Sequence, residues 1–200
     1  MVAEKEKTLL ITGFDPFGGE AINPSWEAVA RLPDRIGGWR VEKRQIPTQF
    51  GLAAETVLAT AAECEPDAIL CVGQAGGRAG VTPEVVAINL REAKIADNAG
   101  AMPQNEPVVA GAREAYFSTV PVREMVAAIK ARGIPSALSY SAGAFVCNDT
   151  LYRLLHDYHG TPTRVGFIHV PFLPEQAKND QPSLTLDTIT EALAAAIEAL

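Results

Sequence analysis

The chain has 200 residues, 48% hydrophobic and 20% charged, so it is too apolar to remain disordered. We expect one domain, residues 1–200, that buries about 70% of the surface of the unfolded chain. A net charge of −7 and an isoelectric point of about 5.0 exclude a protein whose overall field attracts nucleic acid or an anionic membrane. No apolar run approaches the roughly 20 residues of a membrane span.

Three cysteines, an odd number, argue against a disulfide framework and for a reducing compartment. The first residues, Met1–Lys7, alternate in charge and lack the apolar core of a signal peptide. We therefore expect a cytoplasmic protein that binds neither nucleic acid nor membrane.

The first predicted strand is Thr8–Thr12, an apolar and β-branched run typical of a strand buried on both faces of a parallel sheet. The loop that follows, Gly13–Gly19, contains two large aromatic residues, Phe14 and Phe17. Ligands tend to bind at the carboxyl ends of strands in α/β sheets. These rings are therefore candidates for the wall of an apolar pocket; the alternative is that they pack on the core.

A glycine-rich loop, Gly73–Gly80, follows a second buried strand and has four glycines in eight residues. Such a loop bends sharply or approaches a ligand closely. It is not a P-loop, which needs Lys-Ser/Thr after the last glycine, nor a dinucleotide fingerprint, whose spacing differs.

The elements before it are predicted to be a helix from Trp26 to Leu32 capped by Ser25, a strand at Arg40–Gln45, a helix from Thr48 through Glu63 and a strand in Pro66–Val72.

Glu84 lies between this glycine loop and the next apolar strand, Val85–Leu90, an edge where catalytic carboxylates occur. A solvated surface glutamate is the alternative. A further strand is predicted at Tyr116–Val120, and a helix at Val122–Arg132 has its apolar residues on one face.

Cys147 follows a turn of small residues, Ser141–Ala144, and precedes a helical pattern. A short strand-like run, Ala137-Leu138, comes before the turn, so the cysteine lies at or near a helix start. There the helix dipole and the free N–H groups favour an anion, so the thiol ionises more easily and becomes a candidate nucleophile. The alternative is a cysteine that serves only as a small hydrophobic residue.

His169 lies at the carboxyl end of the last predicted strand, Thr163–Pro171, level with the other strand-end loops. A histidine satisfied within the core is the alternative. His156 and His159 are spaced for one helix face, but no third ligand accompanies them, so we expect no metal site. A final helix, Leu184–Leu200, is capped by Ser183. Alternating strands and helices predict a three-layer αβα domain with a largely parallel, mixed and twisted sheet.

Several segments spread over the chain resemble the pyroglutamyl peptidase I family, also called pyrrolidone carboxyl peptidase. The resemblance covers the first strand to the last, and the glutamate and cysteine segments are specific signatures. The matching segments are Leu10–Gly19, Asn23–Ser25, Gly73–Arg78, Glu84 with Ala87–Asn89, Ser139–Asn148 and Gly166–Pro171.

The resemblance implies a cysteine exopeptidase that removes an N-terminal pyroglutamyl residue from peptides through an acyl-enzyme. It makes Cys147 the nucleophile, His169 the base and Glu84 the carboxylate that orients the histidine. It implies no cofactor and no metal, and a homo-oligomer, expected to be a tetramer. The residues expected to hold the pyroglutamyl ring are Phe14, Phe17 and Phe145 as an apolar slot, with Asn23 and Gln74 for the lactam polar groups.

One position departs from the family pattern: Val85 stands where a Lys or Arg usually follows the glutamate. We expect the loss of this cation to alter the ionisation of Glu84 or a local ion pair. Two other functions are considered. One is a nucleoside-phosphorylase-like enzyme that holds phosphate with the glycine loop and Arg78, on fold analogy alone. The other is a non-catalytic binder of pyroglutamyl peptides.

Overall fold

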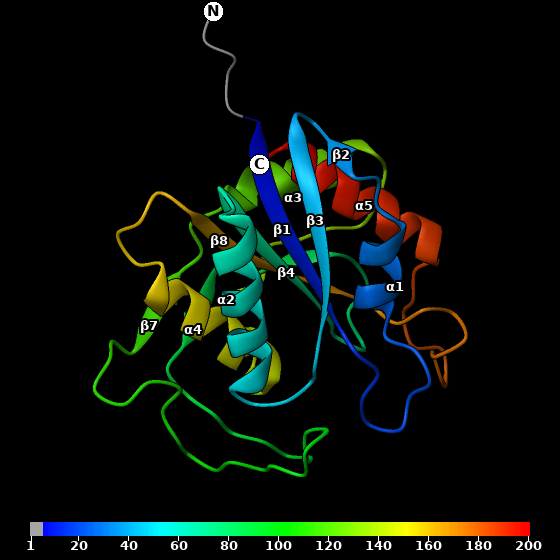
Figure 1. Cartoon of the computed structure of the whole chain (residues 1–200). Helices are drawn as coiled ribbons and strands as arrows, with labels where there is room; N and C mark the ends of the chain where they lie inside the picture. The colour runs from blue at the N-terminus through cyan, green and yellow to red at the C-terminus, as the bar shows by residue number, and fades with distance from the viewer. Residues whose placement is uncertain (1–5) are drawn as a thin grey trace, which may run out of the picture.

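The computed structural model describes residues 6–200 (Figure 1). The charge-alternating start considered above lies outside the described residues except for Glu6 and Lys7. Within the described part of the chain, no helix is long and apolar enough to cross a membrane.

The centre of the molecule is a six-stranded sheet in the order β2-β3-β1-β4-β8-β5. Its four inner strands run parallel, and the two short edge strands are antiparallel to their neighbours. The predicted mixed, largely parallel sheet is confirmed. The strands are β1 (Lys7–Phe14), β2 (Arg35–Ile36), β3 (Trp39–Ile46), β4 (Ala68–Gln74), β5 (Thr82–Pro83) and β8 (Arg164–Val170).

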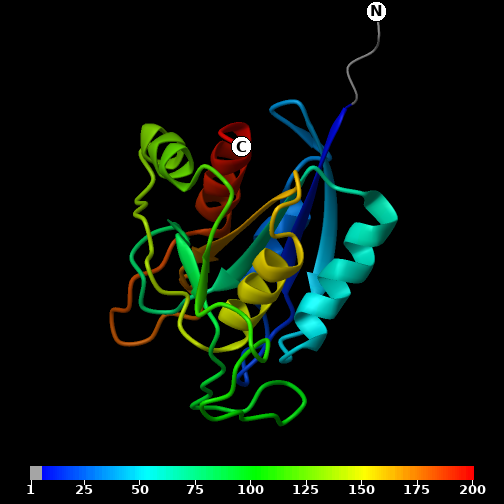
Figure 2. The same cartoon turned by 90° about the vertical axis from the view of Figure 1, so that its left-hand side faces the viewer.

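Helices cover both faces of this sheet (Figure 2). Successive residues of β1 point to opposite faces: Leu9 and Ile11 belong to one apolar cluster and Leu10 to the other. This explains the unbroken apolar run of β1, because both of its faces are buried. One face is covered by α1 (Pro24–Arg31), α3 (Val122–Ala131) and α5 (Leu186–Glu198), the other by α2 (Leu52–Cys64) and α4 (Val146–Asp157).

A second sheet of two antiparallel strands, β6 (Val86–Ile88) and β7 (Ala115–Phe117), lies beside α4. Paired residues point to the same side, so one face carries Val86, Ile88, Ala115 and Phe117. On this face Phe117 is 72% exposed and Ile88 is 38% exposed. The sheet therefore presents an apolar face to solvent, which we call the β6–β7 face.

Three helix caps differ from the sequence prediction. Asn23, not Ser25, caps α1, because its side chain accepts from the Ser25 N–H and Pro24 fills the first helical position. Thr48 does not cap α2, which begins after Gly51 at a φ of 73°. Thr185, rather than Ser183, caps α5 by accepting from the backbone N–H three residues on.

Two predicted strands are shorter or missing. The strand predicted at Val85–Leu90 is only three residues long, and the run Ala137-Leu138 forms no strand. Its neighbours Ser136 and Ser139 instead make isolated parallel bridges to Val81 and Glu84. These bridges hold the segment before Cys147 against the chain around β5.

The fold brings the carboxyl ends of β1, β4 and β8 together at one edge of the sheet. At the end of β1, a Cβ on Gly13 would lie 2.6 Å from the backbone of Trp26. Only glycine therefore lets the start of α1 approach the strand this closely. This contact sets Asn23 beside the strand end, where the pocket described next is found.

Candidate active site

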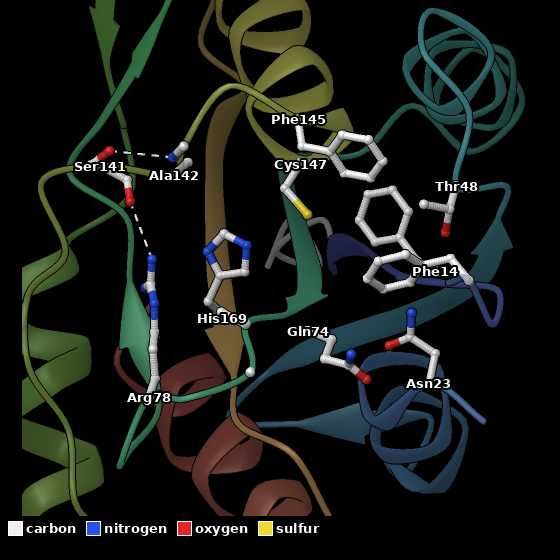
Figure 3. A pocket seen from close by; sticks show the side chains of 14 residues that line it. Phe14, Asn23, Thr48, Gln74, Arg78, Ser141, Ala142, Phe145, Cys147 and His169 are labelled. Carbon is white, nitrogen blue, oxygen red and sulfur yellow. Dashed lines mark hydrogen bonds between the residues drawn. The ribbon is translucent and has the colours of Figure 1, made fainter. Parts of the chain in front are cut away.

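A pocket of about 360 Å³ opens at the carboxyl ends of these strands (Figure 3). All five residues predicted to hold a substrate line it, as do Cys147 and His169. Glu84 does not line it, since it is fully buried behind His169. The lining residues are Phe14, Phe17, Asn23, Thr48, Gln74, Ala75, Gly76, Arg78, Ser141, Ala142, Gly143, Phe145, Cys147 and His169.

Cys147 is the second residue of α4, so the predicted position at a helix start is confirmed. The turn before it depends on Gly143, whose φ of 79° favours glycine. From α4 the half-buried thiol points into the pocket, and the imidazole of His169 lines the same side of it (Figure 3). A Cβ on Gly73 in β4 would lie 2.9 Å from Sγ, so the glycine makes room for the sulfur.

The thiol does not ionise as easily as its place on the helix suggested. Burial, helped by the negative charge of Glu84, raises the pKa of Cys147 to about 12. The positive charge of Arg78 and a backbone hydrogen bond lower it, but they do not outweigh burial. At neutral pH Cys147 is therefore a neutral thiol, and an attack on a carbonyl requires a base.

His169, near the end of β8, is positioned to act as this base. Its Nδ1 lies 2.6 Å from Oε1 of Glu84, and its ring is almost fully buried. Burial lowers the pKa of His169, and the hydrogen bond to Glu84 opposes this without reversing it. The imidazole is therefore neutral at neutral pH, with Nδ1 bonded to Glu84 and Nε2 left for the pocket.

The backbone of Glu84 is held by hydrogen bonds on both of its polar groups. Its N–H donates to the carbonyl of Phe167 at 2.9 Å, and its carbonyl accepts from Oγ of Ser118 at 2.6 Å. Burial alone would raise the pKa of Glu84, but the hydrogen bond from His169 and the positive charge of Arg78 bring it below its usual range. Glu84 is therefore an anion, as a partner for an imidazolium needs to be.

Arg78, to which the family resemblance assigns no role, connects this carboxylate to the wall of the pocket. Its Nη1 lies 2.7 Å from Oε1 of Glu84, and its Nη2 donates to the carbonyl of Ser141 at 3.1 Å. Nη1 also bonds the Thr82 hydroxyl. The guanidinium thus supplies a positive charge beside Glu84, although Val85 next to it has none.

Aromatic rings form the wall of the pocket that lies across from His169 and Arg78 (Figure 3). The rings of Phe17 and Phe145 lie 6.2 Å apart, and Phe50 packs edge-on against Phe145 at 5.2 Å. Phe14 is buried and packs on Phe167, 6.2 Å between ring centroids. Phe14 therefore both packs on the core and lines the pocket, so the two alternatives considered for it hold together.

Two amides, those of Asn23 and Gln74, also line the pocket. Asn23 is buried; its Oδ1 accepts from the N–H and hydroxyl of Ser25, and its Nδ2 donates to the carbonyl of Asp15. Gln74, at the end of β4, accepts through Oε1 from Nε2 of Gln176 at 3.0 Å. Each amide oxygen is therefore occupied within the protein.

Sequence reasoning missed Thr48 as a pocket residue and Gln176 as a neighbour of Gln74. Thr48 is predicted to cap a helix, but its N–H donates to the carboxylate of Asp15 and it lines the pocket. Gln176 lies in no recognised motif, and 102 positions separate it from Gln74. No local pattern marks such a pair.

His156, in the last turn of α4, and His159, just after the helix, both lie against Tyr116. Nδ1 of His156 lies 3.0 Å from the hydroxyl of Tyr116, and the ring of His159 packs near the same tyrosine. In residues 6–200, no three side chains of the metal-ligating types lie close enough to share an ion.

The family model for pyroglutamyl peptidase matches residues 7–200. The chain belongs to this family. Curated relatives named pyrrolidone-carboxylate peptidase include one from Erwinia tasmaniensis, 50% identical over 194 residues, covering 96% of this chain and 91% of the relative. Another, from Enterococcus faecalis, is 51% identical over 196 residues and covers 96% of this chain and 92% of its own length.

Solved structures of the family have the same fold. The pyroglutamyl peptidase I from Bacillus amyloliquefaciens superposes with a TM-score of 0.93 at 48% identity, covering 97% of this chain and 95% of that one. The pyrrolidone carboxyl peptidase from Thermococcus litoralis gives 0.92 at 33% identity, covering 96% and 92%. The predicted family, the α/β fold class and the assignment as a cysteine peptidase, pyroglutamyl peptidase I, are confirmed.

The raised thiol pKa predicts the pH dependence of alkylation. Since the thiolate is the attacking species, the rate at which iodoacetamide modifies Cys147 should rise about tenfold per pH unit between about pH 7 and pH 10, without a plateau. Peptide mapping separates Cys147 from Cys64 and from the buried Cys71, whose pKa is also raised to about 12. A flat rate between about pH 6 and pH 8 would show instead that Cys147 rests as a thiolate.

Proposed function

We propose that this protein removes the N-terminal pyroglutamyl residue from peptides, with Cys147 as nucleophile, His169 as general base and acid, and Glu84 as the carboxylate that orients His169. We also propose that residues 1–200 form one catalytic domain and that the protein acts in the cytoplasm. The observation that carries the mechanism is the 2.6 Å contact between Glu84 and His169, beside a pocket into which the thiol points.

The first chemical step follows from the protonation states. Nε2 of the neutral His169 takes the proton of Cys147 while Sγ attacks the pyroglutamyl carbonyl carbon. The positive charge formed on His169 is stabilised by the anionic Glu84 at Nδ1. The imidazolium then protonates the departing amine, the C–N bond breaks, and water hydrolyses the thioester with His169 as base.

The oxyanion formed in this attack needs hydrogen-bond donors. Cys147 is at the second position of the 12-residue helix α4, so its backbone N–H has no acceptor within the helix. The positive end of the helix dipole lies at the same point. We assign this N–H to the oxyanion, whose charge it stabilises more strongly than the charge of the ground-state carbonyl.

The pocket suits a flat and neutral ring. The aromatic wall of Phe14, Phe17 and Phe145 fits the apolar faces of a lactam, and the free N–H groups of Asn23 and Gln74 fit its carbonyl oxygen. No Asp or Glu of the described residues lines the pocket, so it offers no anion to an N-terminal ammonium. Peptides whose first residue carries a free amine are therefore poor ligands.

The nucleoside-phosphorylase alternative is not favoured, because Arg78, which it needs for phosphate, is engaged by Glu84 and Ser141. The non-catalytic alternative rested on Val85. Glu84 has the cation of Arg78 beside it, so the absence of a charge at Val85 leaves the carboxylate ionised. Neither alternative has an observation in its favour.

Hydrolysis of a pyroglutamyl amide that releases a fluorophore tests the proposed function directly. We expect the parent protein to release the fluorophore and Cys147→Ser to lose nearly all of this activity, because a serine hydroxyl is far less acidic than a thiol. A prolyl amide of the same fluorophore is the control and should not be cleaved. Undiminished activity of Cys147→Ser would refute the mechanism, and an inactive parent that still binds the pyroglutamyl ligand would establish a binding role.

The pH profile of kcat/KM should shift in opposite directions in two variants. Glu84→Gln removes the carboxylate that stabilises the imidazolium, so the pKa of His169 falls, the acid limb moves to lower pH, and the maximal rate drops by roughly 10²–10⁴-fold. Arg78→Met removes a charge that lowers the pKa of His169, so the acid limb moves to higher pH.

Arg78→Lys is the control for charge. It retains a cation near Glu84, so the acid limb of its kcat/KM profile should lie close to that of the parent protein. Parallel shifts of Glu84→Gln and Arg78→Met in the same direction would contradict these electrostatic roles.

We also propose that the protein forms a homo-oligomer, a tetramer by family resemblance, and that the β6–β7 face takes part in the contact. An exposed apolar sheet face is unusual for a monomer, and burying Phe117 against another copy would remove it from water.

Phe117→Glu should shift the mass measured by light scattering to smaller species. Leu52→Glu, which changes an exposed apolar residue of α2, is the control, and equal masses for both variants would exclude the β6–β7 face.

A further inference from the structure

Gln176 lies in the segment after β8 and is only 5% exposed. It does not line the pocket, but its side chain reaches Gln74, which does. Its Nε2 is 3.0 Å from Oε1 of Gln74, 3.3 Å from the carbonyl of Ile22 and 3.4 Å from Oε2 of Glu20. A buried amide with this set of partners has little freedom to turn.

The orientation of the Gln176 amide is determined by backbone groups that have only one polarity. The N–H of Leu173 can only donate, and it lies 3.1 Å from one amide atom of Gln176, which must therefore be the oxygen. The carbonyl of Ile22 can only accept, so the atom facing it must be the nitrogen. The reverse orientation would place the amide nitrogen against the N–H of Leu173, donor against donor. It would also place the amide oxygen against the carbonyl of Ile22, acceptor against acceptor.

The same logic extends from Gln176 to Gln74. Because Gln176 presents a donor, the amide atom of Gln74 that faces it must be an acceptor, Oε1. The amide nitrogen of Gln74 is then the atom left for the pocket. In the view of Figure 3 the amide nitrogens of Gln74 and Asn23 are on the Cys147 side of their oxygens.

Asn23 is oriented in the same way by its own neighbours. Its Oδ1 accepts from the N–H of Ser25, and its Nδ2 donates one hydrogen to the carbonyl of Asp15 and keeps the other. The pocket thus has two amide N–H donors of known orientation beside an aromatic wall. Two such donors match the two lone pairs of one carbonyl oxygen.

We propose that Gln176 is a positioning residue that fixes the amide of Gln74 with its N–H toward the pocket, and that it thereby makes the site selective for a ring that carries a carbonyl. This inference rests on the proposed function for the identity of the ring, a lactam. A turned Gln74 amide would present its oxygen, which fits the ring ammonium of an N-terminal proline better than the carbonyl of a pyroglutamyl group. The orientation set by Gln176 therefore separates these two five-membered rings.

Gln176→Glu tests the proposal, because the new carboxyl, once ionised, accepts from the N–H of Leu173 but cannot donate to Gln74. Burial and the carboxylate of Glu20 favour its protonated form, so the variant is measured at about pH 8 and above. Gln74 should then turn its nitrogen toward the carboxylate and its oxygen toward the pocket. The matched control is Gln181→Glu, the same change at an exposed residue of the same segment, whose Oε1 only accepts from the N–H of Lys178.

The probe is 2-pyrrolidone, the bare lactam ring, and the readout is its protection of Cys147 from iodoacetamide. We expect the concentration for half-protection to rise about tenfold in Gln176→Glu and to stay unchanged in Gln181→Glu, since a misplaced polar partner typically costs this much. The alkylation rate without 2-pyrrolidone should stay the same, because the triad is untouched. With the pyroglutamyl amide, KM should rise and kcat should change little.

A double-mutant cycle separates positioning from a general loss of structure. In a Gln74→Met background, Gln176→Glu should have no further effect on protection, because the amide that it turns is absent. The proposal is overturned if Gln176→Glu behaves like Gln181→Glu, or if it costs the same with and without Gln74. A parent that binds 2-pyrrolidone but cleaves no pyroglutamyl amide refutes the proposed function while the cycle still decides the role of Gln176.

Discussion

The hydrogen bond between Glu84 and Nδ1 of His169 is the contact on which the rest of the site depends. An unpaired carboxylate at a fully buried position is costly, and the two partners of Glu84 offset this cost differently. His169 and Arg78 both donate a hydrogen bond to Oε1, and Arg78 adds a permanent positive charge beside it. Arg78 thus favours the anion of Glu84, so the proton between the pair belongs to the imidazole. Because Nδ1 is bonded to Glu84, Nε2 is the ring nitrogen that remains for the pocket and the thiol.

Much of the architecture could be predicted because it depends on local patterns. Apolar runs such as Thr8–Thr12 mark strands buried on both faces, and strand ends meet at one edge of a parallel sheet, which explains why His169 and the turn before Cys147 converge. The helix caps were less predictable. Asn23 and Ser25 are both good cap residues, and the choice depends on where Pro24 fixes the first turn.

The features that the sequence could not predict depend on contacts between distant residues. The thiol pKa is one, because the helix terminus near Cys147 is visible in the sequence but the degree of burial is not. The amide orientation of Gln74 is another, since it follows from a buried glutamine 102 positions away. The bridges of Ser136 and Ser139, which replace the expected strand at Ala137-Leu138, likewise need the neighbouring chain around β5.

The protonated resting state of Cys147 also bears on how the protein withstands oxidants. Peroxides convert thiolates, not thiols, to sulfenic acid, so a cysteine with a pKa of about 12 reacts slowly with them. Many cysteine enzymes instead keep a stored thiolate and are inactivated when peroxide levels rise. Here the reactive sulfur exists only while His169 holds its proton, during the reaction itself. The burial that makes Cys147 a weak acid thus also slows its oxidation by peroxide.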